Sequence, residues 1–472
     1  MSSHICGRVL AIASAALLSA CRTFSPDGGM GTVATIASQG LNKDVVRVSS
    51  PTDAAHAQTR VARLLRAPLS ADAAVQIALL NNAELQAAYN RLGVAETVAV
   101  QASRPPLPSF SYDWVKTSIE LDIERQVLAS VLQLATWPAR SRIAGVRFEQ
   151  AQLRAAEETL RIAAETRKAY YSAVGARQIL VALNSAKANA AASAELAGKL
   201  TETGAVNKLD QARRQVLASE IEAQVTAAKL KAAVAEERLT RLMGSWAPNV
   251  AAVLPSTLPP LPTKSRSLAS VEQEAMDKRV DLEIARLEVE ALARSYGLTR
   301  STRVVNVLNA SGISKTQKVK GEPSADGGGF DIAFEVPIYD FGMARVREAE
   351  QHYFEALNKL TAMAINARSE AREAYGAYAS TRAIAVQYEQ KVLPLRQTIS
   401  EQTELQYNAM QVDAFALLEA ARENAASKVA SIEAKRNFWL AYTGLSVAVL
   451  GGDSLSQLDG AIVADASGPS GD

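Results

Sequence analysis

The chain has 472 residues, of which 48% are hydrophobic and only 5% aromatic, and its formal net charge is +2. This balance gives no support to a nucleic-acid partner, and two cysteines, Cys6 and Cys21, are too few for a disulfide framework or a thiolate metal site. Few aromatic residues, with glycine and proline gathered in short clusters, are typical of long helices packed closely on one another.

The N-terminus reads as a processed segment. A short apolar run, residues 9–18, cannot span a bilayer and leads into Leu18-Ser19-Ala20-Cys21, which resembles the lipobox of bacterial lipoproteins. That resemblance implies removal of residues 1–20, lipidation of Cys21 with palmitate among its acyl chains, and attachment to one face of a membrane. Arg22 stands where inner-membrane lipoproteins tend to carry aspartate, so we expect the outer membrane. The alternative is an ordinary signal peptide with Cys21 as a bystander.

The first half after this signal is mostly helical in pattern. Residues 21–66 are rich in small and polar residues with little periodicity, and we expect a loose leader there. Apolar spacing predicts helices over 69–101, 144–200 and 208–243, with a proline cluster ending the first and a turn at Gly204-Ala205-Val206-Asn207 ending the second. A Pro-rich linker, 248–262, follows.

A hairpin at residues 108–125 interrupts this helical pattern. Phe110, Tyr112 and Trp114 fall on one face of an extended strand and Asp113 on the other. After a short turn, the acidic residues of the second arm alternate with apolar ones; they are Glu120, Asp122 and Glu124. Period two on both arms predicts an amphipathic hairpin with one apolar and one acidic face.

The second half repeats the plan. We expect a helix over 268–298, strands at 303–312 and 329–338, a long helix over 344–407, a break near Ala409, and a last helix ending at Gly444. Phe330 and Phe334 share one face of the fourth strand.

Short motifs recur about 200 residues apart, which indicates a tandem duplication. Arg167-Lys168-Ala169-Tyr170 matches Arg372-Glu373-Ala374-Tyr375, and both halves end in a glycine, Gly244 and Gly444. The repeats are expected at 67–247 and 263–444, followed by a flexible tail, 445–472.

Geometry limits what such a chain can build. At about 1.5 Å per residue, helices over 144–200 and 344–407 are roughly 85 and 95 Å long, which suits a coiled-coil-like tube. Four strands cannot close a transmembrane barrel, and open sheet edges are not viable in lipid. If the hairpins face a membrane, several chains must share one barrel.

The sequence from residue ~67 to ~444 resembles the TolC family of outer-membrane efflux and secretion channels. The motifs that carry the resemblance are the two repeat starts, the strand–helix junction and the two helix-to-helix turns: Leu69-Ser70-Ala71-Asp72 with Asn81-Asn82-Ala83-Glu84-Leu85, Pro337-Ile338-Tyr339-Asp340-Phe341-Gly342, Gly204 to Arg213, and Tyr407 to Ala420.

The resemblance implies a mainly α fold with a β-barrel part, in which three chains form a twelve-stranded barrel continuous with a helical tunnel. It implies a passive exit duct in the outer membrane that extends into the periplasm, with a periplasmic adaptor and an inner-membrane pump of the RND type as partners. Phe110, Tyr112, Trp114, Phe330 and Phe334 would then face lipid.

The family also places a gate at the periplasmic turns, which are marked here by Gly204 and Ala409. Position by position, Asp210, Tyr407 and Glu419 match pore or gate residues of that family. Threefold repetition would make each acidic residue a ring of like charge, which favours cations. Asp413 has two open readings, a gate residue or a helix N-cap.

No cofactor or enzyme chemistry is expected. His56 and His352 lack metal-ligand spacing, so no metal site is predicted, and no phosphate loop or catalytic constellation stands out. Two alternatives to an efflux duct stay open: the outer-membrane component of a type I protein secretion system, and a non-channel structural envelope lipoprotein. Drugs, organic compounds and metal ions all stay open as exported substrates.

Overall fold

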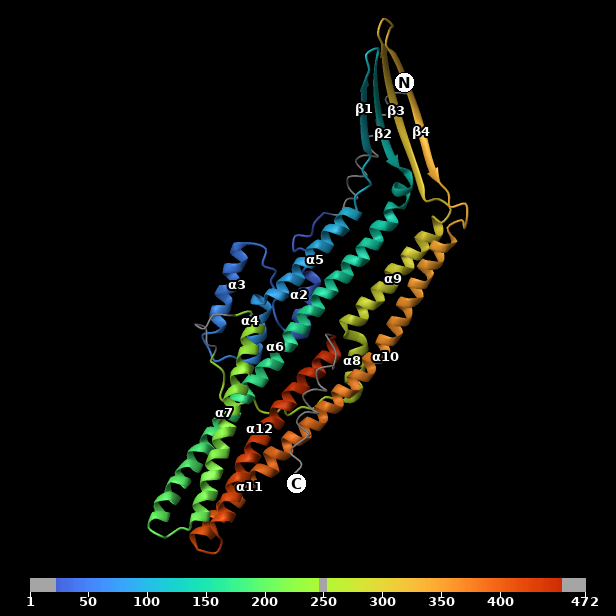
Figure 1. The fold of residues 1–472 in the computed structure, drawn as a ribbon. Coiled ribbons are helices and arrows are strands. Elements are labelled where there is room, and N and C mark those ends of the chain that lie inside the picture. Colours follow the sequence, from blue (N-terminus) through green and yellow to red (C-terminus); the bar gives the residue numbers. More distant parts are fainter. Residues whose placement is uncertain (1–22, 246–252, 452–472) are drawn as a thin grey trace. The chain divides into compact units, whose positions relative to one another are not determined.

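The computed structural model describes residues 23–245 and 253–451. The described chain is mainly helical and carries one four-stranded antiparallel sheet, which confirms the predicted fold class (Figure 1). It forms two compact units that both take segments from both halves of the sequence. Among the described residues, one contains 23–32, 89–155 and 281–364; the other contains 33–88, 156–245, 253–280 and 365–451.

The elements follow one another in the predicted order. The helices of the first half are α2 (Gly31–Leu41), α3 (Pro51–Leu64), α4 (Ala71–Asn81), α5 (Ala83–Ala102), α6 (Val131–Glu202) and α7 (Lys208–Leu242). Those of the second half are α8 (Leu268–Lys278), α9 (Val280–Ser301), α10 (Met343–Gln387), a π-helical turn (Tyr388–Val392), α11 (Leu393–Asn408) and α12 (Ala414–Leu450). The strands are β1 (Ser109–Lys116), β2 (Glu120–Ser130), β3 (Val307–Val319) and β4 (Ala325–Glu335).

The sheet has the order β1-β2-β3-β4, so the two hairpins pair through β2 and β3. The first hairpin is confirmed. The second was placed wrongly, because β3 continues to Val319 and β4 begins at Ala325, whereas 303–312 and 329–338 were expected. The Lys- and Ser-rich residues after Gly312 were read as a loop, but hydrogen bonds to β2 on one side and β4 on the other hold them extended.

The prediction of a loose leader at residues 21–66 is wrong for most of its length. It contains α2, with Val33 and Ala37 buried, and α3. Helix α3 has a local start signal that composition conceals: the Ser50 side chain accepts the N–H of Asp53, and Pro51 occupies the first helical position. Cys21 and the signal residues lie outside the described chain.

Three predicted helices are divided. Asn82 separates α4 from α5, Arg279 separates α8 from α9, and the π-helical turn separates α10 from α11. Pro394 lies at the start of α11, and its ring would collide with the carbonyl four residues earlier in a regular helix. A wider π-helical turn at that point relieves the collision. Conversely, α6 is longer than expected and runs through Pro138.

The last helix does not end at Gly444. Helix α12 continues to Leu450, and Gly444, Leu445 and Val449 are all buried in it. The predicted tail therefore begins too early; residues 452–472 lie outside the described chain. Gly244, in contrast, does follow the end of its helix, with φ +69°.

The second unit has two hydrophobic clusters built in the same way. In each, a short helix, a long helix and the end of a third helix meet. One joins Ile77 of α4, Val174 of α6 and Leu239 of α7. The other joins Ala275 of α8, Tyr378 of α10 and Phe438 of α12, the last two almost fully buried. Burial of an Ile, Val, Leu or Phe side chain in these clusters stabilises the folded state by about 1.5–3 kcal/mol.

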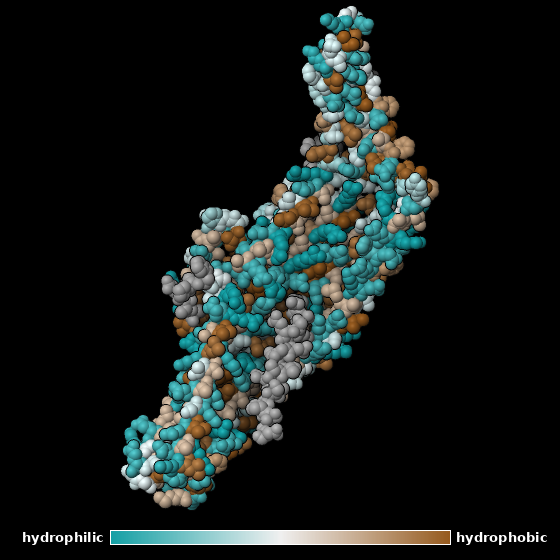
Figure 2. Space-filling view, in the orientation of Figure 1, coloured by the Kyte–Doolittle hydropathy of each residue, from teal (hydrophilic) through white to brown (hydrophobic). Residues whose placement is uncertain are grey.

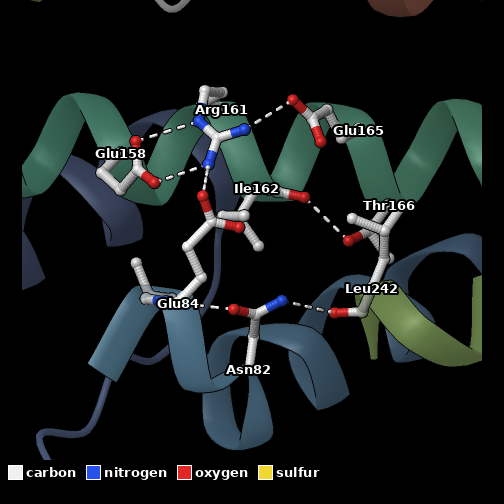
Figure 3. Close-up of polar contacts among 9 residues, drawn as sticks. Asn82, Glu84, Glu158, Arg161, Ile162, Glu165, Thr166 and Leu242 are labelled. Atoms are coloured by element: carbon white, nitrogen blue, oxygen red, sulfur yellow. Dashed lines mark hydrogen bonds and ion pairs between the residues drawn. The ribbon is translucent and has the colours of Figure 1, made fainter. Parts of the chain in front are cut away.

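The break between α4 and α5 anchors the end of α7. The Asn82 amide donates to the Leu242 carbonyl at 2.9 Å, and its oxygen accepts the N–H of Leu85 at 3.0 Å (Figure 3). Beside it, Arg161 of α6 binds Glu158, Glu165 and Glu84, and Glu84 stands at the start of α5 (Figure 3). The carboxylates of Glu158 and, to a smaller extent, Glu165 raise the pKa of Arg161 further above its usual value. The predicted repeat-start motif thus fixes where three helices meet.

Candidate functional site

One face of the sheet is largely apolar across both hairpins. Directly opposite residues of neighbouring strands point to the same side, and the register places Phe110, Val127, Gly312 and Phe330 in one row. By the same alternation, Trp114, Ile123, Ile332 and Phe334 belong to this face. Phe110 is 75% exposed and Phe330 83% exposed. Figure 2 shows hydrophobic side chains on the sheet between its hydrophilic turn end and the helices. Tyr112 lies on this face too, so the structure brings together all five residues predicted to face lipid: Phe110, Tyr112, Trp114, Phe330 and Phe334.

The opposite face is polar. Asp113, Glu124 and Lys315 form one row, and Glu120 and Asp122 lie on the same side. Lys315 binds Asp122 at 2.7 Å, so it relieves part of the repulsion among these carboxylates. The sequence analysis does not identify Lys315, because the predicted strand ends at residue 312 and the residues from Ser314 to Lys318 show no alternation of apolar and polar side chains.

The two predicted turns join helix pairs in the second unit. Gly204, with φ +77°, closes the turn between α6 and α7, and Met410, with φ +59°, closes the turn between α11 and α12. The Asn207 side chain caps α7 by accepting the N–H of Asp210 at 2.8 Å. Ala409 ends α11 without such a positive φ. Met410 takes the left-handed backbone that glycine adopts most easily, and its side chain is 94% exposed.

Of the two readings of Asp413, capping is what the structure shows. Its carboxylate accepts the N–H of Ala416 at 2.9 Å at the start of α12. Asp210 is held locally too, by the amide of Asn207 at 3.0 Å and by Arg213 at 3.6 Å. The Asp210 side chain stays partly exposed and the Asp413 side chain fully exposed.

Tyr407 bonds to a residue that the sequence reading did not single out. Its hydroxyl accepts from Arg214 Nη2 at 3.3 Å, and Arg214 Nη1 donates to Ser193 Oγ at 3.0 Å. Arg214 is only 8% exposed. One guanidinium thus joins α6, α7 and α11 close to both turns. The available signal was its place in the apolar spacing of α7, where it shares the buried face with Ile221 and Val225.

A groove beside these turns contains the fourth predicted gate residue. It encloses about 300 Å³ between α7 and α12, and Glu419 lines it with Glu220 and Arg422. The Arg213 guanidinium lies 5.2 Å over the Phe415 ring in the same groove. Arg422 and Glu220 approach to 3.8 Å. Charge of both signs therefore lines the space next to the turns.

The described residues contain neither a membrane-spanning helix nor a metal-binding cluster. In residues 23–245 and 253–451, no helix is long and apolar enough to cross a membrane. Within the same ranges, no group of three or more His, Cys, Asp or Glu side chains is arranged to hold a metal ion.

Comparison with known proteins gives matches among solved structures only; no protein-family model and no curated protein matches the chain. The Campylobacter jejuni CmeC outer membrane channel superposes with a TM-score of 0.69 at 16% identity, over 86% of this chain and 89% of that one. The outer membrane protein VceC from Vibrio cholerae gives 0.65 at 16% identity, over 84% and 97%. The Neisseria gonorrhoeae MtrE outer membrane channel, in its open state, gives 0.67 at 14% identity, over 83% and 89%. The chain has the fold of these outer-membrane channels.

Proposed function

We propose that the chain is the outer-membrane channel of a tripartite efflux system, a passive exit duct rather than an enzyme. The observation that carries this proposal is the sheet: the register gathers apolar side chains of both hairpins on one exposed face and charged side chains on the other. A water-soluble protein rarely leaves so large an apolar face uncovered. The same alternation, apolar outward and polar inward, is what a transmembrane barrel requires.

Closure of the barrel needs more than one copy. The outer strands β1 and β4 each have a neighbour on one side only. An unpaired strand edge cannot stay in hydrocarbon, and four strands are too few to close on themselves. Three copies joined edge to edge, β1 of one to β4 of the next, give twelve strands and leave no free edge. The chain shares its fold with proteins described as outer membrane channels, and a channel in a membrane requires such a closed wall.

The remaining assignments rest on the resemblance of the sequence motifs to the TolC family. The helices would continue the channel into the periplasm, where an adaptor protein and an inner-membrane pump of the RND type meet it. Tyr407, Asp210, Asp413 and Glu419 would act at the gate near the turns, and Cys21 would carry the lipid anchor. The pump would supply the energy and much of the substrate selection.

The test uses the full chain purified in a mild detergent. We expect a trimer whose mobility on gels changes on heating, and which conducts ions in planar bilayers. The variant Cys21→Ser should assemble and conduct like the wild-type chain, since the lipid anchor only holds the protein to the membrane. A monomer without conductance would contradict the proposal and favour a structural envelope lipoprotein.

A further inference from the structure

The apolar face of the sheet ends in basic residues on the side of the two hairpin turns. The last complete row there is Lys116, Leu121 and Lys318. Both lysines are exposed, and neither forms an ion pair with any residue in the described part of the chain. Lys315, on the opposite face of the same strand, does pair, with Asp122. The two lysines are thus free cations at the rim of an apolar surface.

Arg125 lies further inside the same face. It stands opposite Tyr112 on one side and Ser314 on the other. Its guanidinium lies 5.8 Å over the Tyr112 ring, and Nη1 reaches Thr316 Oγ1 at 3.5 Å, one row nearer the turns. A charge on a lipid-facing surface is costly unless its head reaches the interface. The side chain therefore leans in the direction that brings its charge toward the two lysines.

The spacing of these rows matches the height of a membrane band. From Phe110 to Lys116 the strand rises about 20 Å, and from Phe334 to Phe330 about 13 Å more. With strands tilted by 35–45°, this length corresponds to roughly 25 Å along the membrane normal, the usual height of the apolar band of such barrels. Lys116 and Lys318 then lie where hydrocarbon gives way to headgroups.

We propose that Lys116 and Lys318, helped by Arg125, bind the anionic phosphate headgroups of lipids in the leaflet nearest the hairpin turns. This inference rests on the proposed function, since it requires the apolar face to contact lipid. Cations at a membrane surface each attract anionic lipid by about 1 kcal/mol, or about fivefold, and the attraction falls with salt. The site selects by charge, and the apolar rows below it supply the contact with acyl chains.

The test measures which lipid collects beside the sheet. The assembled full chain is placed in bilayers that contain brominated phosphatidylglycerol or brominated phosphatidylcholine, and quenching of tryptophan fluorescence gives their relative binding constants. Trp114 is two residues from Lys116 and reports on this rim. We expect a preference for phosphatidylglycerol that falls about fivefold in Lys318→Gln, falls further in the double variant Lys116→Gln/Lys318→Gln, and shrinks at high salt.

Lys315→Gln is the matched control. It removes the same charge from the same strand, three residues away and on the polar face, so it should keep the wild-type preference. Equal preference for both lipids in the wild type, or an equal loss in Lys315→Gln, would overturn the inference and leave the lysines as solvated side chains. Absence of quenching by either brominated lipid would mean that the sheet is not in lipid, which would contradict the proposed function itself.

Discussion

Arg214 of α7 donates a hydrogen bond to the hydroxyl of Tyr407 in α11, 193 residues further along the chain, at 3.3 Å. The guanidinium is almost fully buried, and its Nε has no hydrogen-bond partner among the described residues. A buried charge with few partners is costly, so each bond it does make matters to the local arrangement. The contact ties the helix pair of one turn to the helix pair of the other.

Tyr407→Phe removes the hydroxyl that accepts this hydrogen bond and keeps the aromatic ring. If the contact holds the turns together in a closed channel, we expect the open fraction in planar bilayers to rise about fivefold, the effect of losing about 1 kcal/mol. Tyr339→Phe is the control, because Tyr339 is 98% exposed. Identical conductance in both variants would show that the tie does not restrain the gate.

Two variants of Asp413 test its role as a helix cap separately from its role in the pore. Asparagine keeps an oxygen for the N–H of Ala416 but removes the charge, whereas alanine removes both. We expect Asp413→Ala to lower stability by about 1 kcal/mol and Asp413→Asn to lower it by much less. If Asp413 also lines the pore, both variants lower cation over anion permeability, measured as a reversal potential in a salt gradient. Unchanged permeability in both would leave capping as its role.

The first hairpin was predictable because its pattern is local. Alternation of aromatic and polar residues from Phe110 to Trp114 has period two, and no helix can present it on one face. The extension of β3 to Val319 was not visible in the same way. Its residues there are polar on both sides, and they stay extended because β2 and β4 flank them.

The contact between Arg214 and Tyr407 lay beyond any local pattern. The spacing of α7 places Arg214 on the buried face, but nothing in the sequence pairs it with a residue of α11. Such pairings depend on how helices pack across the fold. Helix α3, which we did not predict, is a different case, because its start signal lies in the sequence. Ser50-Pro51 marks a helix N-terminus, but the small and polar residues around it favoured a loose segment.

Gly244 and Gly204 are glycine for different structural reasons. Both have positive φ, but a Cβ on Gly244 would lie 2.3 Å from the Asn81 carbonyl oxygen, whereas one on Gly204 would meet nothing within 4 Å. We expect Gly204→Ala to cost about 1 kcal/mol from backbone strain alone, and Gly244→Ala to cost at least twice that. Thermal melting of the two variants checks the difference. Equal melting temperatures would mean that the end of α4 at Asn81 moves aside freely.

We expect the folded protein to lose stability at alkaline pH because of the buried hydroxyl of Tyr170. Burial raises the pKa of its hydroxyl from 10.0 to about 12, and that hydroxyl donates to the Leu69 carbonyl at 2.9 Å. Because the folded state holds this proton more tightly than the unfolded state, its contribution is complete below about pH 10 and is lost as the pH rises toward 12. Tyr170→Phe should flatten the fall of melting temperature between these values. Tyr339→Phe should not, and an equal flattening would assign the fall to other groups.

Tyr112 and Ser111 test which face of the sheet meets lipid. They are neighbours in β1 and point to opposite sides, so lysine at either position adds the same charge at the same height. On a lipid-facing position near the membrane centre a lysine costs about 2–4 kcal/mol per copy, and Arg125 opposite Tyr112 adds repulsion. We therefore expect Tyr112→Lys to abolish the heat-modifiable trimer on gels and Ser111→Lys to retain it. Loss of the trimer in both variants, or in Ser111→Lys alone, would mean that the apolar face does not contact lipid.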